Sequence, residues 1–377
     1  MELEFTSDQD ELRDSIRAVL GKESPVALAR TIVEDHTRPT ALWATMVDLG
    51  WPALTIAETH GGIGLGVLEL AILAEELGRV IAPGPLLPTI SQFAPAVREA
   101  GTPEQHARFL GAVAAGGLTG SLAIAEETGS FEPAEVETTL TFDGTSVALS
   151  GTKRFVVEGD AVDELVVIAR VGRPTPTDDG VRAVVVPVDE VDAISVHAFD
   201  GSRRLAPVDL DGVRVLRDRV LGDPDVSATE PLRRALEEST VALALEMVGT
   251  AQTIFDTTLE YAKQREQFGV PIGSFQAIKH KFVDMNIALE RARALGYFAA
   301  LTIAEDDPRR TSATSVAKAA AGDCQRLLAK EGIQIHGGIG YTWEHDMQLL
   351  VKRIKSGEPL FGTSTWHKAR IAELLGV

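Results

Sequence analysis

The sequence predicts an α+β protein with helical ends and a middle part built of strands. Apolar residues recur with helical spacing in residues 1–117. Short apolar runs between Gly and Pro turn signals fill residues 118–228, which is typical of a compact β domain. Helical spacing returns in residues 229–377. We therefore expect three consecutive domains with these boundaries: an N-terminal helical domain, a middle β domain and a C-terminal helical bundle.

The N-terminal zone contains three predicted helices. Ser7 and Asp10 precede an apolar stripe and are candidate helix caps. The second helix carries Leu42 on its apolar stripe and ends at Gly50. The third covers residues 68–77 and is followed by Gly78 and a proline-rich exit at Pro83, Pro85 and Pro88.

The middle zone begins with a hairpin. Strands at residues 138–142 and 146–149 flank Asp143-Gly144, a dipeptide that favours a tight turn. Asp211-Gly212 predicts a second hairpin on the same grounds. Two further strands and the prolines between them complete the zone: residues 165–168 and 183–186, with Pro174 and Pro176.

The C-terminal zone predicts long helices joined by short loops. No proline interrupts the chain between Pro231 and Pro271, and the apolar residues there are spaced for one buried face. Such helices are typical of an antiparallel bundle. The other predicted helices run from Ser274 or Phe275 to about Glu305, from Thr311 or Ser312 to about Gln334, and, as shorter pieces, after Trp343 and after Thr363.

Composition restricts the function classes. The 377 residues, 45% of them hydrophobic, are enough for a large core. A formal net charge of −19 argues against sequence-independent nucleic-acid binding and against attraction to anionic lipid. One cysteine, Cys324, excludes an intramolecular disulfide, and no second Cys or suitable His lies near it to make a metal site. The acidic start Met1-Glu2-Leu3-Glu4 lacks the apolar stretch of a signal peptide, so we expect a cytoplasmic protein.

A five-residue sequence, His-Gly-Gly-Ile-Gly, occurs at residues 60–64 and again at residues 336–340. The flanking residues do not match, and five residues are too few for a repeat architecture. Neither copy has the glycine spacing of a dinucleotide fingerprint between a strand and a helix. We interpret the two copies separately.

Two stretches of the C-terminal zone resemble a known family. The first, residues 265–276, reads REQFGVPIGSFQ, and the second, residues 334–341, reads QIHGGIGY. In this order and spacing they resemble the two signature segments of the acyl-CoA dehydrogenase family. The order of the three zones is similar to that family's N-terminal helices, β domain and C-terminal four-helix bundle, so the resemblance covers essentially the whole chain. It implies FAD as the cofactor.

The chemistry of these stretches is consistent with that resemblance. A flavin diphosphate needs a cation and closely packed backbone amides. Arg265 offers a bidentate donor, and glycines let the backbone approach a ligand without a Cβ clash. In the family, two neighbouring subunits supply the two segments to one FAD, which implies at least a dimer and often a tetramer. The FAD-binding residues implied by the resemblance are Arg265, Gln267, Phe268, Gln276, Gln334, Gly337, Gly338, Gly340, Phe155 and Thr363.

Each of these features also has a plain structural interpretation. Arg265 is equally a solvated residue at a helix end, and residues 337–340 are equally a helix C-cap and turn. His336 is interpreted as a packing or hydrogen-bonding residue rather than a catalyst, and His345 as a structural residue at the start of a helix. The two stretches together favour the cofactor over these alternatives.

The resemblance also places the flavin ring on the β domain. Ala125-Glu126-Glu127 occupies the position of the family's Thr-Glu-Pro, and Phe155-Val156-Val157 that of an aromatic-Ile-Thr run. Phe155 keeps an aromatic side chain near the ring. Val157 lacks the hydroxyl that would donate a hydrogen bond to the flavin.

The family's reaction is α,β-dehydrogenation of an acyl-CoA thioester, in which a carboxylate removes the α-proton and the β-hydrogen leaves as hydride to the flavin. Two positions in the family supply that carboxylate, and here they are Phe361, ahead of Gly362-Thr363, and Ser239. Neither is acidic. Glu238 is one residue from the second position and is our candidate base, although one residue rotates a side chain about a quarter turn around a helix. Glu237, Glu238 and Glu358 each also have a plain interpretation as ordinary surface carboxylates, which we favour for each of them.

Three functions follow from the missing carboxylate. The first, implied by the resemblance, is that the chain is an FAD-dependent acyl-CoA dehydrogenase that would use Glu238 and pass electrons to an electron-transfer flavoprotein. Alternatively, it is a non-catalytic partner that completes a flavin site in a heteromeric enzyme, as in actinobacterial members that act on steroid side-chain CoA esters. The third alternative is a flavin monooxygenase on the same scaffold. The sequence does not specify the acyl group.

Overall fold

The computed structural model describes residues 4–173, 175 and 178–377. The start of the chain at Met1–Leu3 and the predicted separators Pro174 and Pro176 lie outside this part. The described chain forms two compact units: one contains residues 1–38, 67–83 and 240–377, and the other residues 39–66 and 84–239. The units alternate along the chain, whereas the expected domains are consecutive. The last boundary between the two observed units, after residue 239, falls inside the 36-residue helix α9 (Thr229–Gln264).

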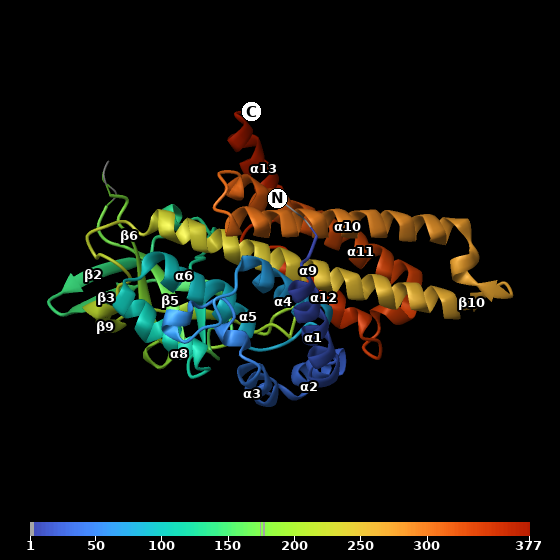
Figure 1. The fold of residues 1–377 in the computed structure, drawn as a ribbon, viewed down its shortest axis with the longest axis horizontal. Coiled ribbons are helices and arrows are strands. Elements are labelled where there is room, and N and C mark those ends of the chain that lie inside the picture. The colour runs from blue at the N-terminus through green and yellow to red at the C-terminus, as the bar shows by residue number, and fades with distance from the viewer. Residues whose placement is uncertain (1–3, 174, 176–177) are drawn as a thin grey trace. The chain divides into compact units, whose positions relative to one another are not determined.

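The first unit is helical, as predicted for the two ends of the chain. Helix α10 begins at Gln276 and α11 at Arg310, each within a few residues of its predicted start, and the two lie side by side (Figure 1). The first helix is capped by Thr6, which forms a capping box with Gln9, rather than by Ser7 or Asp10. A helix that the pattern did not predict follows Pro25. The helices of this unit, besides part of α9, are α1 (Ser7–Glu23), α2 (Val26–Asp35), α4 (Val67–Arg79), α10 (Gln276–Ala304), α11 (Arg310–His336), α12 (Met347–Gly357) and α13 (Ser364–Leu375).

Helices α4 and α9 cross backbone to backbone within this unit. A Cβ atom on Gly249 would lie 1.9 Å from the carbonyl oxygen of Glu75, and one on Gly78 would lie 2.0 Å from that of Glu246. Only glycine fits at either position. The hydroxyl of Thr250 donates to the carbonyl oxygen of Gly78 at 2.9 Å, which ties the two helices at the crossing.

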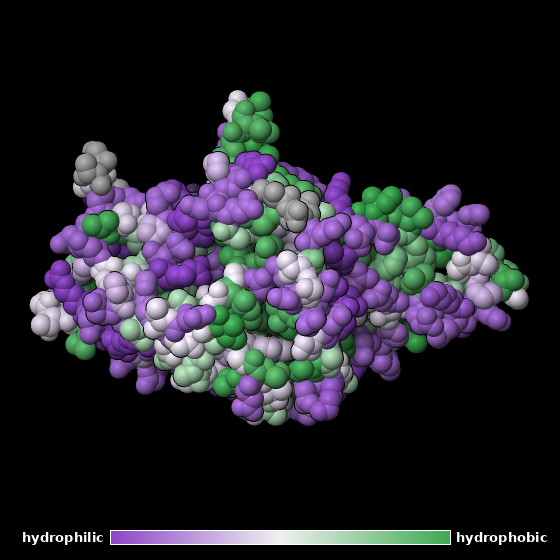
Figure 2. All heavy atoms as spheres, in the orientation of Figure 1, coloured by the Kyte–Doolittle hydropathy of each residue, from purple (hydrophilic) through white to green (hydrophobic). Residues whose placement is uncertain are grey.

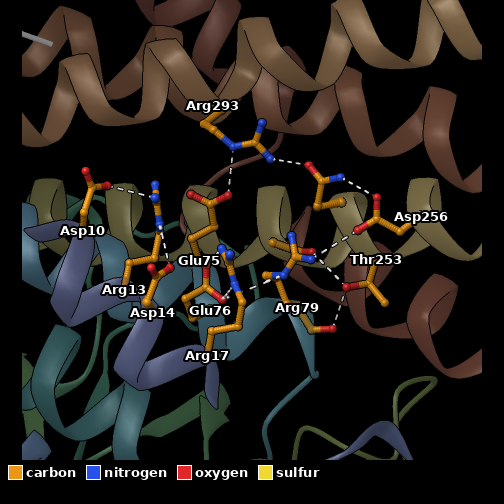
Figure 3. Close-up of polar contacts among 12 residues, drawn as sticks. Asp10, Arg13, Asp14, Arg17, Glu75, Glu76, Arg79, Thr253, Asp256 and Arg293 are labelled. Atoms are coloured by element: carbon orange, nitrogen blue, oxygen red, sulfur yellow. Dashed lines mark hydrogen bonds and ion pairs between the residues drawn. The ribbon is translucent and has the colours of Figure 1, made fainter. Parts of the chain in front are cut away.

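The crossing places two carboxylates of α4 in the interior, where they are paired. Glu75 accepts hydrogen bonds from Arg293 of α10 at 2.9 Å and from the hydroxyl of Tyr297 at 2.7 Å. Glu76, 2% exposed, accepts two hydrogen bonds from Arg17 of α1. Figure 3 shows Arg17 of α1 and Arg293 of α10 converging on the two carboxylates of α4. Because a buried charge is costly unless it is paired, this network fixes how the helices pack.

The second unit contains the β domain and short helices. Its hairpin of β2 (Thr139–Asp143) and β3 (Ser146–Ser150) confirms the prediction from Asp143-Gly144. The other strands are β1 (Gly120–Ala123), β4 (Thr152–Val157), β5 (Glu164–Arg170), β6 (Val181–Pro187), β7 (Asp192–Ala193), β8 (Leu205–Asp209) and β9 (Arg214–Leu216). The main helical segments are α3 (Thr40–Asp48), α6 (Ala94–Ala100) and α8 (Gly111–Ala114).

The strands of this unit form two sheets with a common core. One has the order β1-β5-β2-β3-β9, with β6 also pairing with β5, and the other has the order β4-β8-β7. Val156 of β4 and Val208 of β8 share one hydrophobic cluster with Val147 of β3, Val167 of β5 and Val184 of β6. The core therefore joins the two sheets.

The hairpin predicted at Asp211-Gly212 is wrong. The flanking strands β8 and β9 do not pair with each other: β8 pairs with β4 and β7, and β9 pairs with β3. Asp211-Gly212 instead carries the chain from one sheet to the other, and the Asp211 side chain accepts hydrogen bonds from Ser150 and Gly151. A turn signal specifies a reversal of the chain but not which strands will pair.

In the described part of the chain, no helix is long and apolar enough to cross a membrane. Cys324 lies buried on α11, and burial raises the pKa of its thiol to about 12. Such a thiol stays protonated and is a poor nucleophile.

We expect Glu75→Ala to lower the free energy of unfolding by ~3 kcal/mol, because the half-buried Arg293 loses one of its two carboxylate partners and the buried Tyr297 hydroxyl loses its acceptor. Chemical denaturation followed by circular dichroism measures this change. The matched control is Glu260→Ala, since Glu260 pairs with Lys263 at the surface, where both side chains are more than half exposed. We expect it to cost less than ~0.5 kcal/mol. Equal costs for the two variants would contradict the role assigned to the network.

Candidate functional site

The Arg-containing stretch is a hairpin that links α9 to α10. Strands β10 (Glu266–Gln267) and β11 (Val270–Pro271) pair around a turn at Phe268 and Gly269, both with left-handed backbone. Phe268 is 95% exposed. The side chains of the three polar residues predicted to bind FAD from this stretch are exposed as well: Arg265, Gln267 and Gln276. The hairpin thus presents a cation, two amides and an aromatic ring at its surface.

The Gly-rich stretch is the turn that ends α11. Gly337 has φ of +66°, which L-residues with a side chain rarely adopt. A Cβ atom on Gly337 or Gly338 would meet nothing within 4 Å, so the backbone there is open to a ligand. Gly340 differs, because a Cβ atom on it would lie 2.7 Å from that of His336. Two of the three predicted glycines leave the backbone accessible, and the third allows the turn to pack.

The buried side chain of His336 packs against residues on either side of the turn. Its ring stacks on Tyr261 at 4.5 Å between centroids and meets His345 edge-on at 4.9 Å. Its Nδ1 donates to the carbonyl oxygen of Gly332 at 2.8 Å, and burial lowers the pKa of the imidazole. A neutral ring with a hydrogen-bonded Nδ1 confirms the packing role predicted for His336. His345 accepts the amide N–H of Met347 at 3.0 Å, which confirms its structural role at the start of α12.

The residues of these two stretches fit the diphosphate and ribityl parts of FAD. The Nε2 atom of His336, next to the open glycines in the chain, is buried and has no hydrogen-bond partner in the described part of the protein. An acceptor at this place can be satisfied by a hydroxyl group. Arg265 supplies a positive charge for phosphate, and the Gln334 side chain, exposed on the last turn of α11, offers a neutral donor and acceptor.

Arg30 of α2 holds the segment after the turn. Its guanidinium donates to the carboxylate of Asp346 at 2.7 and 3.0 Å and to the carbonyl oxygen of Trp343 at 2.7 Å. The indole N–H of Trp343 in turn donates to Glu34 at 2.9 Å. A helix more than 300 residues earlier in the chain therefore fixes the exit of the Gly-rich turn. Sequence reasoning missed Arg30, because no local pattern marks a contact of this separation.

Strand β4, which carries one of the two segments expected at the flavin ring, contains a bulge. The pairing of β4 with β8 shifts between Lys153 and Val156. Phe155, inside the bulge, has φ of +57° and a half-exposed side chain. Val157 is buried, and its position carries no hydroxyl that could bind a flavin. The exposed aromatic side chain is thus set by a specific backbone distortion.

The loop that contains Phe361 is fixed on both sides. The ammonium group of Lys318, fully buried on α11, donates to the carbonyl oxygens of Glu358 and Gly362, both at 2.8 Å. His367 donates from Nε2 to the carbonyl oxygen of Phe361 at 2.9 Å, and burial lowers the pKa of this imidazole to about 3, so the ring is neutral. Phe361 itself is buried. One family position for the base is therefore an immobilised apolar residue.

Two polar residues beside this loop cap α13. The Glu358 carboxylate accepts the amide N–H of Ser364 at 3.0 Å, and Thr363 accepts that of Trp366 at 3.1 Å. Glu358 is partly buried and caps a helix terminus, which differs from its interpretation as an ordinary surface carboxylate. The bond to Thr363 uses its oxygen as acceptor and leaves its hydroxyl proton for another partner.

The second family position for the base lies on α9. Ser239 is 1% exposed and donates to the carbonyl oxygen of Ser91 at 2.6 Å. Glu238 is equally buried and forms an ion pair with Arg98 of α6 at 2.5 Å. Its second oxygen, Oε1, is buried without a hydrogen-bond partner among the residues that the structure describes. Glu238 thus has one committed oxygen and one available oxygen. The interpretation of Glu237 and Glu238 as surface carboxylates is therefore wrong, since they are 8% and 1% exposed.

Comparison with known proteins agrees with this geometry. Residues 6–117 match the model of the acyl-CoA dehydrogenase N-terminal domain, and residues 231–376 match that of the C-terminal domain. Acyl-CoA dehydrogenase IpdE2 of Mycobacterium tuberculosis is 32% identical over 345 residues, which cover 91% of this chain and 89% of that protein.

Solved structures give the same result at the level of the fold. The glutaryl-coenzyme A dehydrogenase glutaryl-CoA complex matches with a TM-score of 0.91 at 23% identity and covers 100% of this chain and 97% of that chain. The ChsE4-ChsE5 complex from Mycobacterium tuberculosis matches with a TM-score of 0.89 at 24% identity and covers 100% and 99%.

We expect Arg265→Ala to weaken FAD binding at least ~tenfold, because it removes a charge-assisted contact to phosphate. The FAD content of the assembled oligomer, measured by visible absorption after gel filtration, checks this. Lys263→Ala is the control, since Lys263 is an exposed cation two residues away. Unchanged FAD content in the Arg265 variant would rule out its predicted role.

We expect Arg30→Ala to speed amide hydrogen exchange in residues 343–347 and to weaken FAD binding by a few-fold, since the exit of the Gly-rich turn loses three hydrogen bonds. Exchange followed by mass spectrometry and an FAD titration measure the two effects. Lys22→Ala, which removes an exposed cation of α1, should change neither. Protection that survives in the Arg30 variant would show that the turn is fixed by other contacts.

Proposed function

Because the chain belongs to the acyl-CoA dehydrogenase family, whose members are FAD-dependent oxidoreductases, we propose that it carries out α,β-dehydrogenation of an acyl-CoA thioester to the enoyl-CoA. The observation that carries the proposal is the pairing of an exposed Arg265 hairpin with a glycine turn that is open at Gly337 and Gly338. Both are surfaces for one dinucleotide cofactor.

Different residues of the chain would bind different parts of the cofactor. When bound, the flavin supplies the acceptor for the hydride that leaves the β-carbon. Arg265 would hold the diphosphate, with Gln267, Gln276 and Gln334 as neutral partners, and Phe155 would cover the ring. The remaining requirement is a base within hydrogen-bond reach of the α-proton.

Glu238 is the candidate base of this chain. Its unpartnered Oε1 has a lone pair available, and burial excludes water, which would otherwise compete for the proton. Arg98 holds the other oxygen at 2.5 Å and fixes the orientation of the carboxylate. In this proposal Oε1 receives the α-proton.

A second candidate function is a partner subunit that completes the flavin site of a heteromeric acyl-CoA dehydrogenase. It is favoured by the immobilised Phe361 and by Ser239, whose hydroxyl is already bonded to the backbone. A sibling chain would then supply the carboxylate. One of the structures with this fold is that of the ChsE4-ChsE5 complex.

Exposed apolar side chains support an oligomer in either case. Phe268, Val270 and Phe275 are exposed at the β10–β11 hairpin. Leu374 and Leu375 are exposed at the end of α13, which appears as an apolar surface in Figure 2. We propose that neighbouring subunits cover these residues, and that an electron-transfer flavoprotein accepts the electrons.

The test is anaerobic visible absorption of the purified chain with and without saturated acyl-CoA esters of graded size. If Glu238 is the base, the flavin bleaches on addition of a substrate, and Glu238→Gln slows the bleaching by two or more orders of magnitude while FAD content is unchanged. The control is Glu237→Gln, the neighbouring carboxylate.

Other outcomes assign the function differently. Bleaching only after mixing with a sibling chain that carries Glu at the position of Phe361 would establish the partner role and remove Glu238 from the mechanism. Oxygen consumption without enoyl-CoA formation would identify a monooxygenase instead.

A further inference from the structure

The β domain contains a fully buried lysine that the proposed reaction does not use. Lys153 of β4 is 0% exposed. Its ammonium group donates to the carboxylate of Glu126 at 2.6 Å and to the carbonyl oxygen of Ile124 at 3.2 Å. A lysine is almost never fully buried without a compensating partner, so this pair has to be satisfied for the local structure to form.

Glu126 connects a third segment to the pair. Its carboxylate also accepts the amide N–H of Glu137 at 2.7 Å, the amide N–H of Thr138 at 2.8 Å and the hydroxyl of Thr138 at 2.7 Å. The segments 124–126, 137–138 and β4 therefore meet at one carboxylate. Gly151, with φ of +141°, permits this approach, because a Cβ atom there would lie 2.8 Å from the Thr138 hydroxyl oxygen.

The same pair lies directly beneath the bulge that exposes Phe155. The amide N–H of Arg154 donates to the carbonyl oxygen of Ala125 at 2.7 Å, next to the two groups that Lys153 binds. Lys153 is the last residue before the shift in pairing, and Phe155 lies inside it. The position of Phe155 thus depends on how segment 124–126 is held against β4.

The charges around Lys153 are few. Burial lowers the pKa of its ammonium group to about 8, although Glu126 opposes the shift. Burial by itself would raise the pKa of Glu126. The interactions with Lys153 and Thr138 together are stronger than this effect of burial, so the pKa of Glu126 is lowered. Five charged residues on the adjoining segments carry exposed side chains: Glu127, Glu137, Arg154, Asp209 and Asp211. Two others are less exposed: Arg170, whose Nε donates to the carbonyl oxygen of Val136, is partly buried, and Glu158, directly after β4, is buried.

We propose that the Lys153–Glu126 pair is a positioning device for the flavin-ring site, and that FAD affinity depends on the charge of this pair. The inference rests on the proposed function, since it takes segments 124–127 and 155–157 to face the ring. The pair holds both segments in one geometry through Ile124, Ala125 and Thr138. Neither side chain touches the reacting atoms.

The sign of the pH dependence separates this role from general stability. As pH rises through about 8, Lys153 loses its proton, the charge-assisted bond to Glu126 is lost, and FAD affinity falls. The ordinary pKa of lysine is 10.5, so between about 8 and 10.5 the unfolded chain binds more protons than the folded chain. The contribution of Lys153 to the free energy of unfolding therefore rises with pH in that window. Weaker FAD binding there is not a consequence of unfolding through this group.

The experiment is titration of the apo-oligomer with FAD at pH 7 and pH 9, alongside its thermal midpoint. In the wild type we expect the dissociation constant to rise about tenfold between the two pH values. Lys153→Met removes the charge, with a side chain one heavy atom shorter, and should bind FAD about tenfold more weakly at pH 7, with little further change at pH 9. Arg214→Met, which removes a surface cation paired with Asp143 in the same domain, should behave like the wild type.

Amide exchange tests the geometry without FAD, at the N–H groups of Thr138 and Arg154. We expect faster exchange in the Lys153 variant than in the wild type at pH 7; the wild-type FAD titration at the two pH values does not depend on the variant folding. FAD affinity that is the same in both proteins at both pH values, with exchange that is the same at pH 7, would overturn the inference alone. A wild-type oligomer that binds no FAD at pH 7 would overturn the proposed function and the inference with it.

Discussion

The close crossing of α4 and α9 is the constraint on which the rest of the helical unit depends. Two glycines, Gly78 and Gly249, allow backbone contact that no other residue would permit. The contact carries Glu75 and Glu76 into the interior, where burial requires cationic partners from α1 and α10. The packing of α1, α4, α9 and α10 therefore depends on glycine, which has no side chain, at these two positions. The hairpin and the glycine turn both extend from helices of this unit, so its rigidity sets where they lie.

The β domain also contains a buried charge that requires a partner of opposite sign, but here the fully buried residue is a cation. There a lysine is buried, and a carboxylate with three further donors compensates it. Such a centre has one low-energy arrangement, because each donor and acceptor has to be satisfied at once. Order of this kind suits a binding site, since a pre-organised site loses less entropy when the ligand arrives.

The acidic residues near the candidate site show why local sequence is a weak guide to a base. Glu358 caps a helix, Glu126 compensates Lys153, and Glu238 pairs with Arg98. Each carboxylate has a structural task that would survive without any catalysis. Of these, Glu238 retains an unpartnered buried oxygen, which a structural pair does not need. The position of Phe361 is decided separately, by Lys318 and His367 holding its loop.

The sequence by itself determined the α+β class, the helices from residue 229 onward, the first β hairpin and the resemblance of two stretches to the family's signature segments, because periodicity, turn dipeptides and contiguous motifs are local properties. It did not determine strand pairing, so the turn at Asp211-Gly212 was assigned to the wrong partners. Tertiary structure alone decided that Arg30 fixes the exit of the glycine turn, that Lys153 lies buried under Phe155, and that Gly340 packs on His336 whereas Gly337 stays open. Some of these contacts join residues far apart in the chain, and others depend on which side of a turn is covered by the rest of the protein. Neither property can be inferred from a short local sequence.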